Sequence, residues 1–298
     1  MKKLLFLFFL TIITLCCSSC INSIPSNDIN TTNETNDQDA DVLSENPKVR
    51  RSMLNDDEKE IYDKYLPYAL SYTPFEFNYI NEGYDMDSVH NALYSIWLDY
   101  PETWLYFGWG FESDIKKSGE EYSVYYTGLL SSRYRSLSHL QNHKDDFDKE
   151  YVNDYIEKIN DECNNILKQM PKKLSTKEKY IWIAKYLCSI TEYYNDGESD
   201  YLYADGPILY GKGVCQSYAY AYQWLCQKAG LWCITCSGMA HGEAHCWNVV
   251  KLDNGQTYYM DLTWADDSKN PDQYYFMTYE ECTKKRELDE GEWIADGE

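Results

Sequence analysis

The sequence predicts an α+β fold in which helices precede antiparallel strands. Apolar residues recur every three or four positions in several segments between residues 55 and 230, which is the period of an amphipathic helix. Beyond Gly230 the pattern changes to short runs rich in β-branched and aromatic residues, which are typical of strands. The Asp-Asn-Gly sequence at 253–255 is a strong hairpin signal between two of these runs. Helices followed by an antiparallel hairpin indicate the α+β class.

The first half of the folded part is expected to contain two helices and a β-hairpin. Asn55 and Glu58 have the spacing of a capping box, which marks the start of the first helix. The second helix ends at Pro101. Two runs rich in aromatic residues, 103–111 and 121–128, are predicted to form the hairpin. The helical residues expected to face the core are Ile61, Tyr65, Leu66, Val89, Leu93, Ile96 and Trp97.

The second half is expected to hold three more helices and then three strands. A capping box of Ser175 and Glu178 opens the middle helix, and Gly230 has the position of a C-cap for the last. Residues 191–213 are expected to form a loop. The helices are predicted over 145–170, from 175 onward and from 215 to the Gly230 cap, and the strands over 231–238, 244–252 and 256–264.

The N-terminus is predicted to be an export signal of the lipoprotein type. Residues 1–20 combine the basic start MKK with a 12-residue apolar run, Leu4–Leu15, which is too short to cross a bilayer comfortably. Small residues lead to Cys20, the candidate lipidation site. Ordinary cleavage and an uncleaved anchor remain open alternatives. We therefore expect an exported protein that is anchored in the membrane at the cell surface.

Three segments are expected after the signal. Residues 21–50 are rich in Asn, Asp, Ser and Thr and bury too little apolar surface to fold, which predicts a flexible tether. Residues 51–140 are expected to form an N-terminal helix-hairpin module. Residues 141–298 are expected to form the domain that carries the chemistry.

The net charge limits the classes of partner. The formal charge of the 298 residues is −22, and a field of that sign repels phosphate backbones, so the sequence predicts no nucleic-acid partner. It is compatible with basic or lysine-bearing partners, and equally with a surface that only keeps the protein soluble. The 30 tyrosines can also be interpreted in two ways. They could contact a ligand such as a sugar, or they could fill half-buried positions in which the ring packs and the hydroxyl stays in water.

Cys215 is the candidate nucleophile. It lies at the expected N-terminus of a helix, where the helix dipole lowers the pKa of a thiol, and the thiolate is the attacking species. Gly211 and Gly213 precede it and allow a sharp turn with close backbone approach. The helix behind it has an apolar face, which is expected to anchor the helix while the sulfur faces a cleft. Cys226, three turns later, is expected to be structural.

A nucleophilic thiol needs a base, and the base needs a group that orients it. His245 begins one predicted strand, and Asp261 lies in its partner across the turn. Pairing outward from Asn254 and Gly255 sets His245 opposite residue 264, so that Asp261 is offset by about three residues. A bulge or a wider turn is expected to absorb this offset.

Three motifs carry Cys215, His245 and Asp261 in that order: GVCQSYA at 213–219, HCWN at 245–248 and YYMDLTW at 258–264. Together they resemble the transglutaminase-like superfamily, which commonly has GVCxGYA, HAWN and a D-x-TW element. This resemblance covers residues 175–280 best. Ser217 stands where the family commonly has Gly, and Cys246 where it commonly has Ala, and both residues are small.

The resemblance implies a papain-like core, in which the helix bearing the cysteine packs on an antiparallel sheet, preceded by a small α/β leader module. It implies Cys215 as nucleophile, His245 as base and Asp261 as the group that orients His245, with the backbone N–H of Cys215 in an oxyanion hole. The residues expected at the substrate cleft are Gln216, Tyr218, Trp247, Asn248 and Trp264, the two Trp rings as packing around the hairpin and Asn248 as polar support.

The implied reaction is acyl transfer from an amide bond of a protein or peptide, cell-wall peptide included. A cysteine peptidase or amidase passes the acyl group to water, and a transglutaminase passes it to a lysine amine. No organic cofactor is expected. Calcium dependence occurs in some members of that family, but the sequence has no EF-hand-like pattern of ligands, so no metal is expected. The membrane partner is expected only through the N-terminal lipid.

Other interpretations remain open. The fold could serve as a catalytically inactive surface binding module, or Cys215 could be an ordinary buried thiol. A zinc knuckle has the spacing C-x2-C-x4-H-x4-C, but its usual basic surroundings are missing here. The residues with that spacing are Cys233, Cys236, His241 and Cys246, and the first two could also form a local disulfide.

Overall fold

The computed structural model describes residues 48–71, 76–78, 84–105, 111–115, 122–127, 149–195 and 201–298. All of them fall within one compact unit, Ser44–Glu298. The predicted signal, Cys20 and residues 21–47 of the predicted tether lie outside the described residues, as does the predicted domain boundary at residue 140. The last residues of the predicted tether require a correction, because helix α2 (Val49–Met53) begins there and buries Val49 and Arg50.

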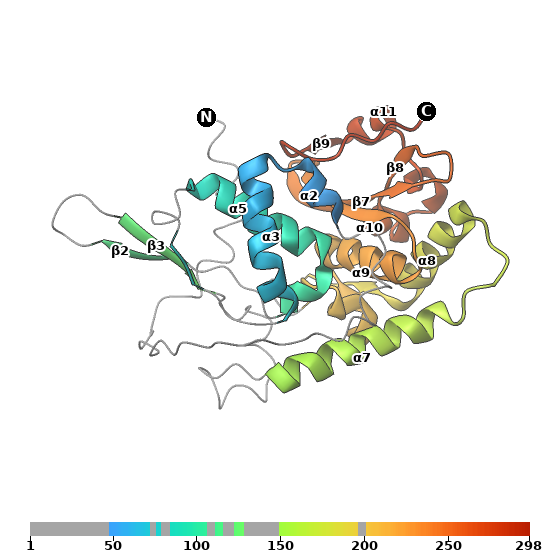
Figure 1. Cartoon of the computed structure of the whole chain (residues 1–298). Coiled ribbons are helices and arrows are strands. Elements are labelled where there is room, and N and C mark those ends of the chain that lie inside the picture. Colours follow the sequence, from blue (N-terminus) through green and yellow to red (C-terminus); the bar gives the residue numbers. More distant parts are fainter. Residues whose placement is uncertain are drawn as a thin grey trace. The chain divides into compact units, whose positions relative to one another are not determined.

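Helices α2, α3 (Asp56–Leu70) and α5 (Met86–Asp99) pack against one another (Figure 1). The predicted capping box starts α3, because the Glu58 N–H donates to Asn55 Oδ1 at 2.9 Å and the Asn55 N–H donates to Glu58 Oε2 at 2.8 Å. Six of the seven predicted core residues of these helices are buried, and Leu66 is partly buried against them. The helical periodicity therefore predicted the correct faces.

A hairpin is present, but among the described residues its first strand shares only Phe111 with the predicted run 103–111. Strands β2 (Phe111–Ile115) and β3 (Tyr122–Thr127) pair antiparallel, and β1 (Glu76–Asn78), which the sequence did not reveal, pairs with the other edge of β3. The prediction of a strand from residue 103 is wrong, because the 3₁₀ helix η4 (Pro101–Leu105) occupies its start. Proline fixes a helical φ there.

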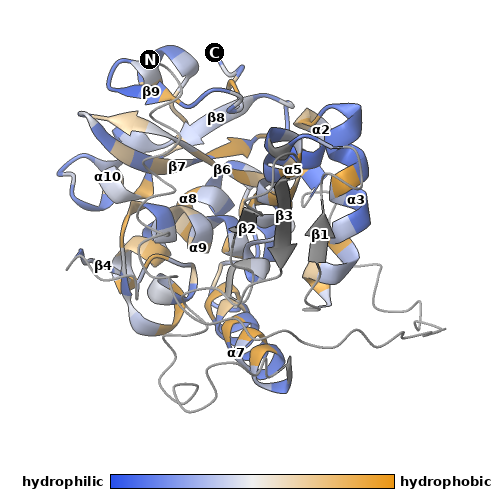
Figure 2. Cartoon of the chain, turned by 90° about the vertical axis from the view of Figure 1, so that its left-hand side faces the viewer, coloured by the Kyte–Doolittle hydropathy of each residue, from blue (hydrophilic) through white to orange (hydrophobic). Residues whose placement is uncertain are grey.

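Two long helices follow, α7 (Lys149–Leu167) and α8 (Thr176–Ile190). Figure 2 shows hydrophobic and hydrophilic positions alternating around α7. Its apolar stripe buries Tyr155, Ile159, Cys163 and Ile166 in the core. The predicted capping box of α8 is present, with the Ser175 N–H donating to Glu178 Oε2 at 2.8 Å.

The predicted loop at 191–213 contains short regular pieces. Strands β4 (Glu192–Tyr193) and β5 (Lys212–Gly213) form a parallel pair, and a π-helical turn, η6 (Gly206–Tyr210), lies between them. Residues 196–200 lie outside the described residues. These segments lead into helix α9 (Cys215–Lys228). The helix ends just before Gly230, whose backbone is in the left-handed region with φ +70°.

A four-stranded antiparallel sheet forms the C-terminal half, in the order β8-β7-β6-β9. The predicted strands correspond to β6 (Cys233–Ala240), β7 (Glu243–Lys251) and β8 (Thr257–Met260), and β9 (Arg286–Leu288) adds an edge next to β6. The short helical segments after β8 are α10 (Leu262–Asp266), η7 (Pro271–Tyr274) and α11 (Tyr279–Thr283).

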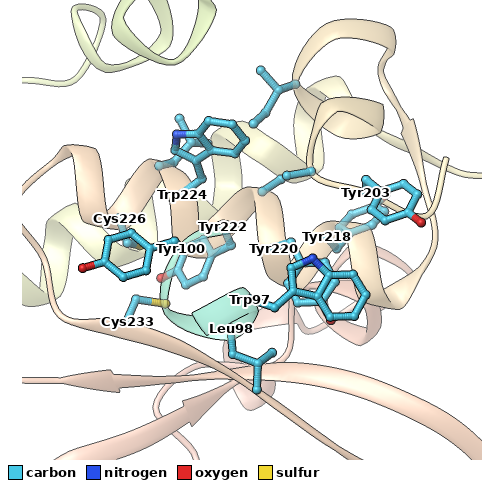
Figure 3. Packing of buried hydrophobic residues seen from close by; sticks show 14 of the residues in the cluster. Trp97, Leu98, Tyr100, Tyr203, Tyr218, Tyr220, Tyr222, Trp224, Cys226 and Cys233 are labelled. Carbon is cyan, nitrogen blue, oxygen red and sulfur yellow. The ribbon is translucent and has the colours of Figure 1, made fainter. Parts of the chain in front are cut away.

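The sheet is covered on both faces. Alternate residues of its strands belong to two different hydrophobic clusters. One cluster lies under α9 and includes Cys233 and Val250, and the other includes Cys236 and Val249. Figure 3 shows aromatic side chains of α9 packed together with Trp97, the last of the predicted core residues on α5. The predicted α+β class, with the Cys215 helix packed on an antiparallel sheet, is confirmed.

No helix within the described ranges is long and apolar enough to cross a membrane.

Candidate active site

Cys215 is the first residue of α9 and is half-buried. The chain before it is tightly held, because a Cβ on Gly213 would lie 2.5 Å from Ser217 Oγ and 2.9 Å from Pro207 Cγ. The Ser217 hydroxyl accepts the Val214 N–H at 2.8 Å and so satisfies one of the free donors at the helix start. Ser217, which replaces the family's usual Gly, therefore stabilises the turn that presents Cys215.

Helix α9 lies along the face of β7 that carries Cys246 and Asn248. Asn248 Nδ2 donates to the carbonyl oxygen of Ala219 at 2.9 Å. One helical turn before Ala219 is Cys215, and two residues before Asn248 on the same face of the strand is Cys246. The step along the helix and the step along the strand each cover about 6 Å. The contact between Asn248 and Ala219 therefore also brings the thiols of Cys215 and Cys246 close together.

The electrostatic surroundings favour a thiolate on Cys215. A hydrogen bond from the Cys246 thiol lowers the pKa of Cys215 well below its usual value, and His245 lowers it further, although burial opposes both. The same contact and burial raise the pKa of Cys246, so Cys246 keeps its proton and remains the donor. The residue that departs from the family's usual Ala is therefore in direct contact with the candidate nucleophile.

His245 and Asp261 are hydrogen-bonded, with 2.9 Å between His245 Nε2 and Asp261 Oδ2. The register explains how they meet, because Asn248 pairs with Met260 and Lys251 with Thr257 around a five-residue loop, 252–256. This pairing sets His245 opposite residue 263 rather than 264. Asp261 is thus offset by two residues and shares a face with His245. The wider turn was one of the two solutions expected from the sequence.

The Asp261 side chain also starts the next helix. Strand β8 ends at Met260, and Asp261 is the N-cap of α10, where its Oδ1 accepts the Trp264 N–H at 3.1 Å. The prediction that Asp261 belongs to a strand running to residue 264 is wrong for this reason. The cap leaves Oδ2 free to accept from His245.

The His245–Asp261 pair has the electrostatics of a protonated imidazole beside an ionised carboxylate. Burial alone would lower the pKa of His245, but hydrogen bonds with Asp261 and Cys215 outweigh it and raise the pKa to about 9. Burial would raise the pKa of Asp261, but His245 and Arg286 hold it below its usual value. Because Nε2 faces Asp261, Nδ1 is the ring nitrogen left for Cys215.

Arg286 is a residue of this site that sequence reasoning missed. Its Nε donates to Asp261 Oδ2 at 3.1 Å, its Nη2 donates to the same oxygen, and its side chain is 1% exposed. In the sequence it follows Lys284 and Lys285 and looks like part of a charged surface. Nothing local marks it as buried, because its partner is 25 residues away.

The five predicted cleft residues have different surroundings. Trp264 stacks on the His245 ring, with 5.3 Å between centroids, and Gln216 is half-buried and donates to the Leu202 carbonyl oxygen at 3.2 Å. The prediction that Tyr218 lines the cleft is wrong, because it is 1% exposed and its hydroxyl donates to Asp266 at 2.8 Å. Trp247 and Asn248 are buried as well, which fits packing and polar support.

The four residues with zinc-knuckle spacing do not converge. Cys233 and Cys236 point to opposite faces of β6 and are not joined by a disulfide. His241 stacks on Trp264 at 5.1 Å, and Cys246 lies beside Cys215. Among the residues that the structure describes, no three His, Cys, Asp or Glu side chains are arranged to hold a metal ion. The local disulfide between Cys233 and Cys236 is likewise not formed.

Comparison with known protein families gives a match over this region. Residues 164–262 match the model of the transglutaminase-like superfamily. The matched range contains the three positions 215, 245 and 261. No curated protein matches the chain.

Two solved structures are similar to part of the chain. One is described as a TGase, with 15% identity and a TM-score of 0.34 over 52% of this chain and 43% of that one. The other is a candidate cysteine protease from Cytophaga hutchinsonii, with 16% identity and a TM-score of 0.32 over 52% of this chain and 62% of that one. The chain thus spans less than two thirds of either structure.

Proposed function

We propose that residues 164–262, which match the model of the transglutaminase-like superfamily, catalyse thiol-dependent acyl transfer on amide bonds of proteins or peptides. Members of this superfamily are often cysteine peptidases or acyltransferases. The observation that carries the proposal is the arrangement of a thiol at a helix start, Cys215, beside the imidazole of His245, whose Nε2 lies 2.9 Å from the buried carboxylate of Asp261.

Each group of the proposed triad has one role. The Cys215 thiolate attacks the amide carbonyl carbon, and the imidazolium of His245 gives its proton to the leaving amine. A thioester remains on Cys215. Neutral His245 then accepts a proton from water or from an acceptor amine, which attacks the thioester and releases the thiol. Asp261 keeps the ring oriented and stabilises its charged form.

The helix start supplies a donor for the oxyanion. Cys215 is the first residue of α9, so its backbone N–H has no partner within the helix. The positive end of the helix dipole lies at the same point and favours negative charge there. An oxygen that becomes negative next to Cys215 would therefore be stabilised by groups already in place.

The proposal extends to location and partners. We propose that residues 1–20 direct export, that lipid on Cys20 anchors the chain, and that the polar segment after it holds the catalytic region at the cell surface. Proteins or peptides at that surface, cell-wall peptide included, would be the substrates. The net charge of −22 supports basic segments, and not nucleic acid, as partners.

The reaction is tested with casein and a fluorescent primary amine. Wild type is compared with Cys215→Ser and with Cys226→Ser, a matched control in which the thiol of the same helix is fully buried. We expect amine incorporation or new peptide termini with wild type and Cys226→Ser, and neither with Cys215→Ser. Incorporated amine identifies a transglutaminase, and new termini identify a peptidase.

The proposal fails if Cys215→Ser acts on casein as fast as wild type. It also fails if wild type neither acts on casein nor reacts with a thiol-directed probe at Cys215. That second result would favour the inactive binding module.

A further inference from the structure

We propose that Arg286 is a positioning residue of the active site, which holds Asp261 ionised and oriented toward His245. The inference rests on the proposed function and extends it to a residue outside the matched range of 164–262. It depends on the contacts of one guanidinium group with one carboxylate oxygen and with the aromatic rings around it.

The Arg286 guanidinium has one ionic partner among the residues that the structure describes, and that partner is Asp261. Nε and Nη2 both donate to Oδ2, the oxygen that also accepts from His245 Nε2. Oδ1 accepts the Trp264 N–H. A protonated Oδ2 could not accept from all three of its donors, two of which belong to a guanidinium cation, so the arrangement favours the carboxylate.

Aromatic rings hold the guanidinium in place. Its central carbon lies 3.9 Å from the centroid of the Trp264 ring, which is cation–π distance, and 5.9 Å from those of Trp247 and Tyr274. Trp264 also stacks on His245. One indole therefore sets the positions of both the cation and the imidazole that share Asp261 Oδ2.

The sheet has a feature that brings Arg286 close. Strand β9 pairs with β6, and Leu288 lies opposite Gly238. A Cβ on Gly238 would lie 2.0 Å from the Glu287 carbonyl oxygen and 2.8 Å from the Trp247 ring. Only glycine allows this approach, and Gly238 is also the residue paired with His245 on the other side.

Arg286 is the only permanently charged cation that contacts this carboxylate within the described ranges. The titratable groups that face Asp261 and Arg286 come from four elements. Burial raises the pKa values of the thiols on α8 and α11 to about 12, so both thiols stay neutral. These groups are Cys188 on α8, His245 on β7, Tyr274 on η7 and Cys282 on α11, and His245 also contacts Cys215 on α9.

Loss of the Arg286 charge should shift the pKa of every neighbouring group in the same direction. Removing a fixed positive charge makes each nearby proton harder to lose, so that the carboxyl, imidazole and thiol groups all titrate at higher pH. A purely structural arginine would change the stability of the fold without displacing the titration of Cys215.

The test is the pH dependence of iodoacetamide alkylation at Cys215, quantified on the Cys215 peptide by mass spectrometry. The variants are Arg286→Met and Arg286→Lys. The matched control is Arg50→Met, because Arg50 is also buried and its ion-pair partner is Glu292 rather than Asp261. Circular dichroism reports whether each variant folds.

We expect the acid limb of the Arg286→Met profile to move to higher pH, with alkylation about tenfold slower on that limb, because an adjacent cation shifts a carboxyl by about 1–3 units. Arg286→Lys keeps the charge and should fall between Arg286→Met and wild type. Arg50→Met should follow the wild-type profile.

A folded Arg286→Met or Arg286→Lys protein with the wild-type profile would overturn the positioning role while leaving the proposed function intact. If Arg286→Met does not fold, the Arg286→Lys profile decides. A wild-type Cys215 that titrates as an ordinary thiol would overturn the proposed function, and with it this role for Arg286.

Discussion

Asp99 and Asp261 are both buried aspartates, and their carboxyl groups have opposite properties. Asp99, at the end of α5, accepts the backbone N–H groups of Arg50 at 2.9 Å and Arg51 at 3.1 Å and the hydroxyl of Tyr62 at 2.7 Å. Burial outweighs these bonds and raises its pKa to about 7. Asp261 is at least as buried, yet its pKa is lowered.

The difference lies in the donors. Asp99 receives hydrogen bonds from neutral groups only, since the fork of Arg50 is directed to Glu292 and to the Thr235 carbonyl oxygen. Asp261 receives them from a guanidinium and an imidazole. Asp99 thus fixes α2 against α5 as part of the framework, whereas Asp261 is kept charged at the site. Burial by itself does not identify a catalytic carboxylate, and the charge of its donors distinguishes the two.

The largest expected effect is a difference in enzymatic turnover between variants of the two aspartates. Asp261→Asn should lower the turnover number by about 10³-fold or more, because the amide no longer holds the correct tautomer of His245 or stabilises its charged form. Asp99→Asn should leave turnover per folded molecule close to wild type. The measurement is the initial rate of the casein reaction at equal concentrations of folded protein. Equal losses in the two variants would remove the distinction.

The second effect concerns stability against pH. The folded pKa of Asp99 is about 7, above its ordinary value of 3.8, so the folded state binds this proton more tightly than the unfolded chain does. The contribution of Asp99 is then greatest below about pH 4 and is lost as the pH rises toward 7, by up to about 4 kcal/mol. Asp261 has the opposite sign, because its folded pKa is lowered, and its contribution is lost as the pH falls below its ordinary pKa.

Urea unfolding of wild type and Asp99→Asn at several pH values between 4 and 8 measures the contribution of Asp99 to the free energy of unfolding. Asparagine does not titrate, so the stability difference between the two proteins should shrink as the pH rises. Parallel stability curves would show that Asp99 does not ionise in this range.

The smallest effect tests the thiol beside the nucleophile. Cys246→Ala removes the S–H donor that lowers the pKa of Cys215, and alkylation of Cys215 at pH 6 should slow by roughly three- to tenfold. Cys236→Ala is the control, because that thiol lies on the other face of the sheet. Equal alkylation rates in wild type and Cys246→Ala would show that Cys246 does not support the thiolate.

The sequence was sufficient wherever the signal was local. Capping boxes at Asn55 and Ser175, helical periodicity and the Asp-Asn-Gly turn located the main helices and the hairpin, because these signals act within a few residues of each other. The motif at Cys215 placed the thiol at a helix start. His245 and Asp261 could be named from their motifs, but not their mutual geometry.

The remainder depended on contacts between distant segments. Whether Asp261 shares a face with His245 depends on the width of the 252–256 loop, since one residue more or less reverses the face. The role of Arg286 depends on a three-residue strand that pairs with β6. The burial of Tyr218 depends on Asp266, 48 residues later. No local pattern encodes these contacts.

The most direct test of the account compares the pH profile of Cys215 alkylation in wild type and in His245→Ala. An imidazole that supports a thiolate predicts rapid alkylation of wild type at pH 6, and in the variant a rise only near the ordinary cysteine pKa of about 8.5. Superimposable profiles in the two proteins would contradict a catalytic cysteine–histidine pair.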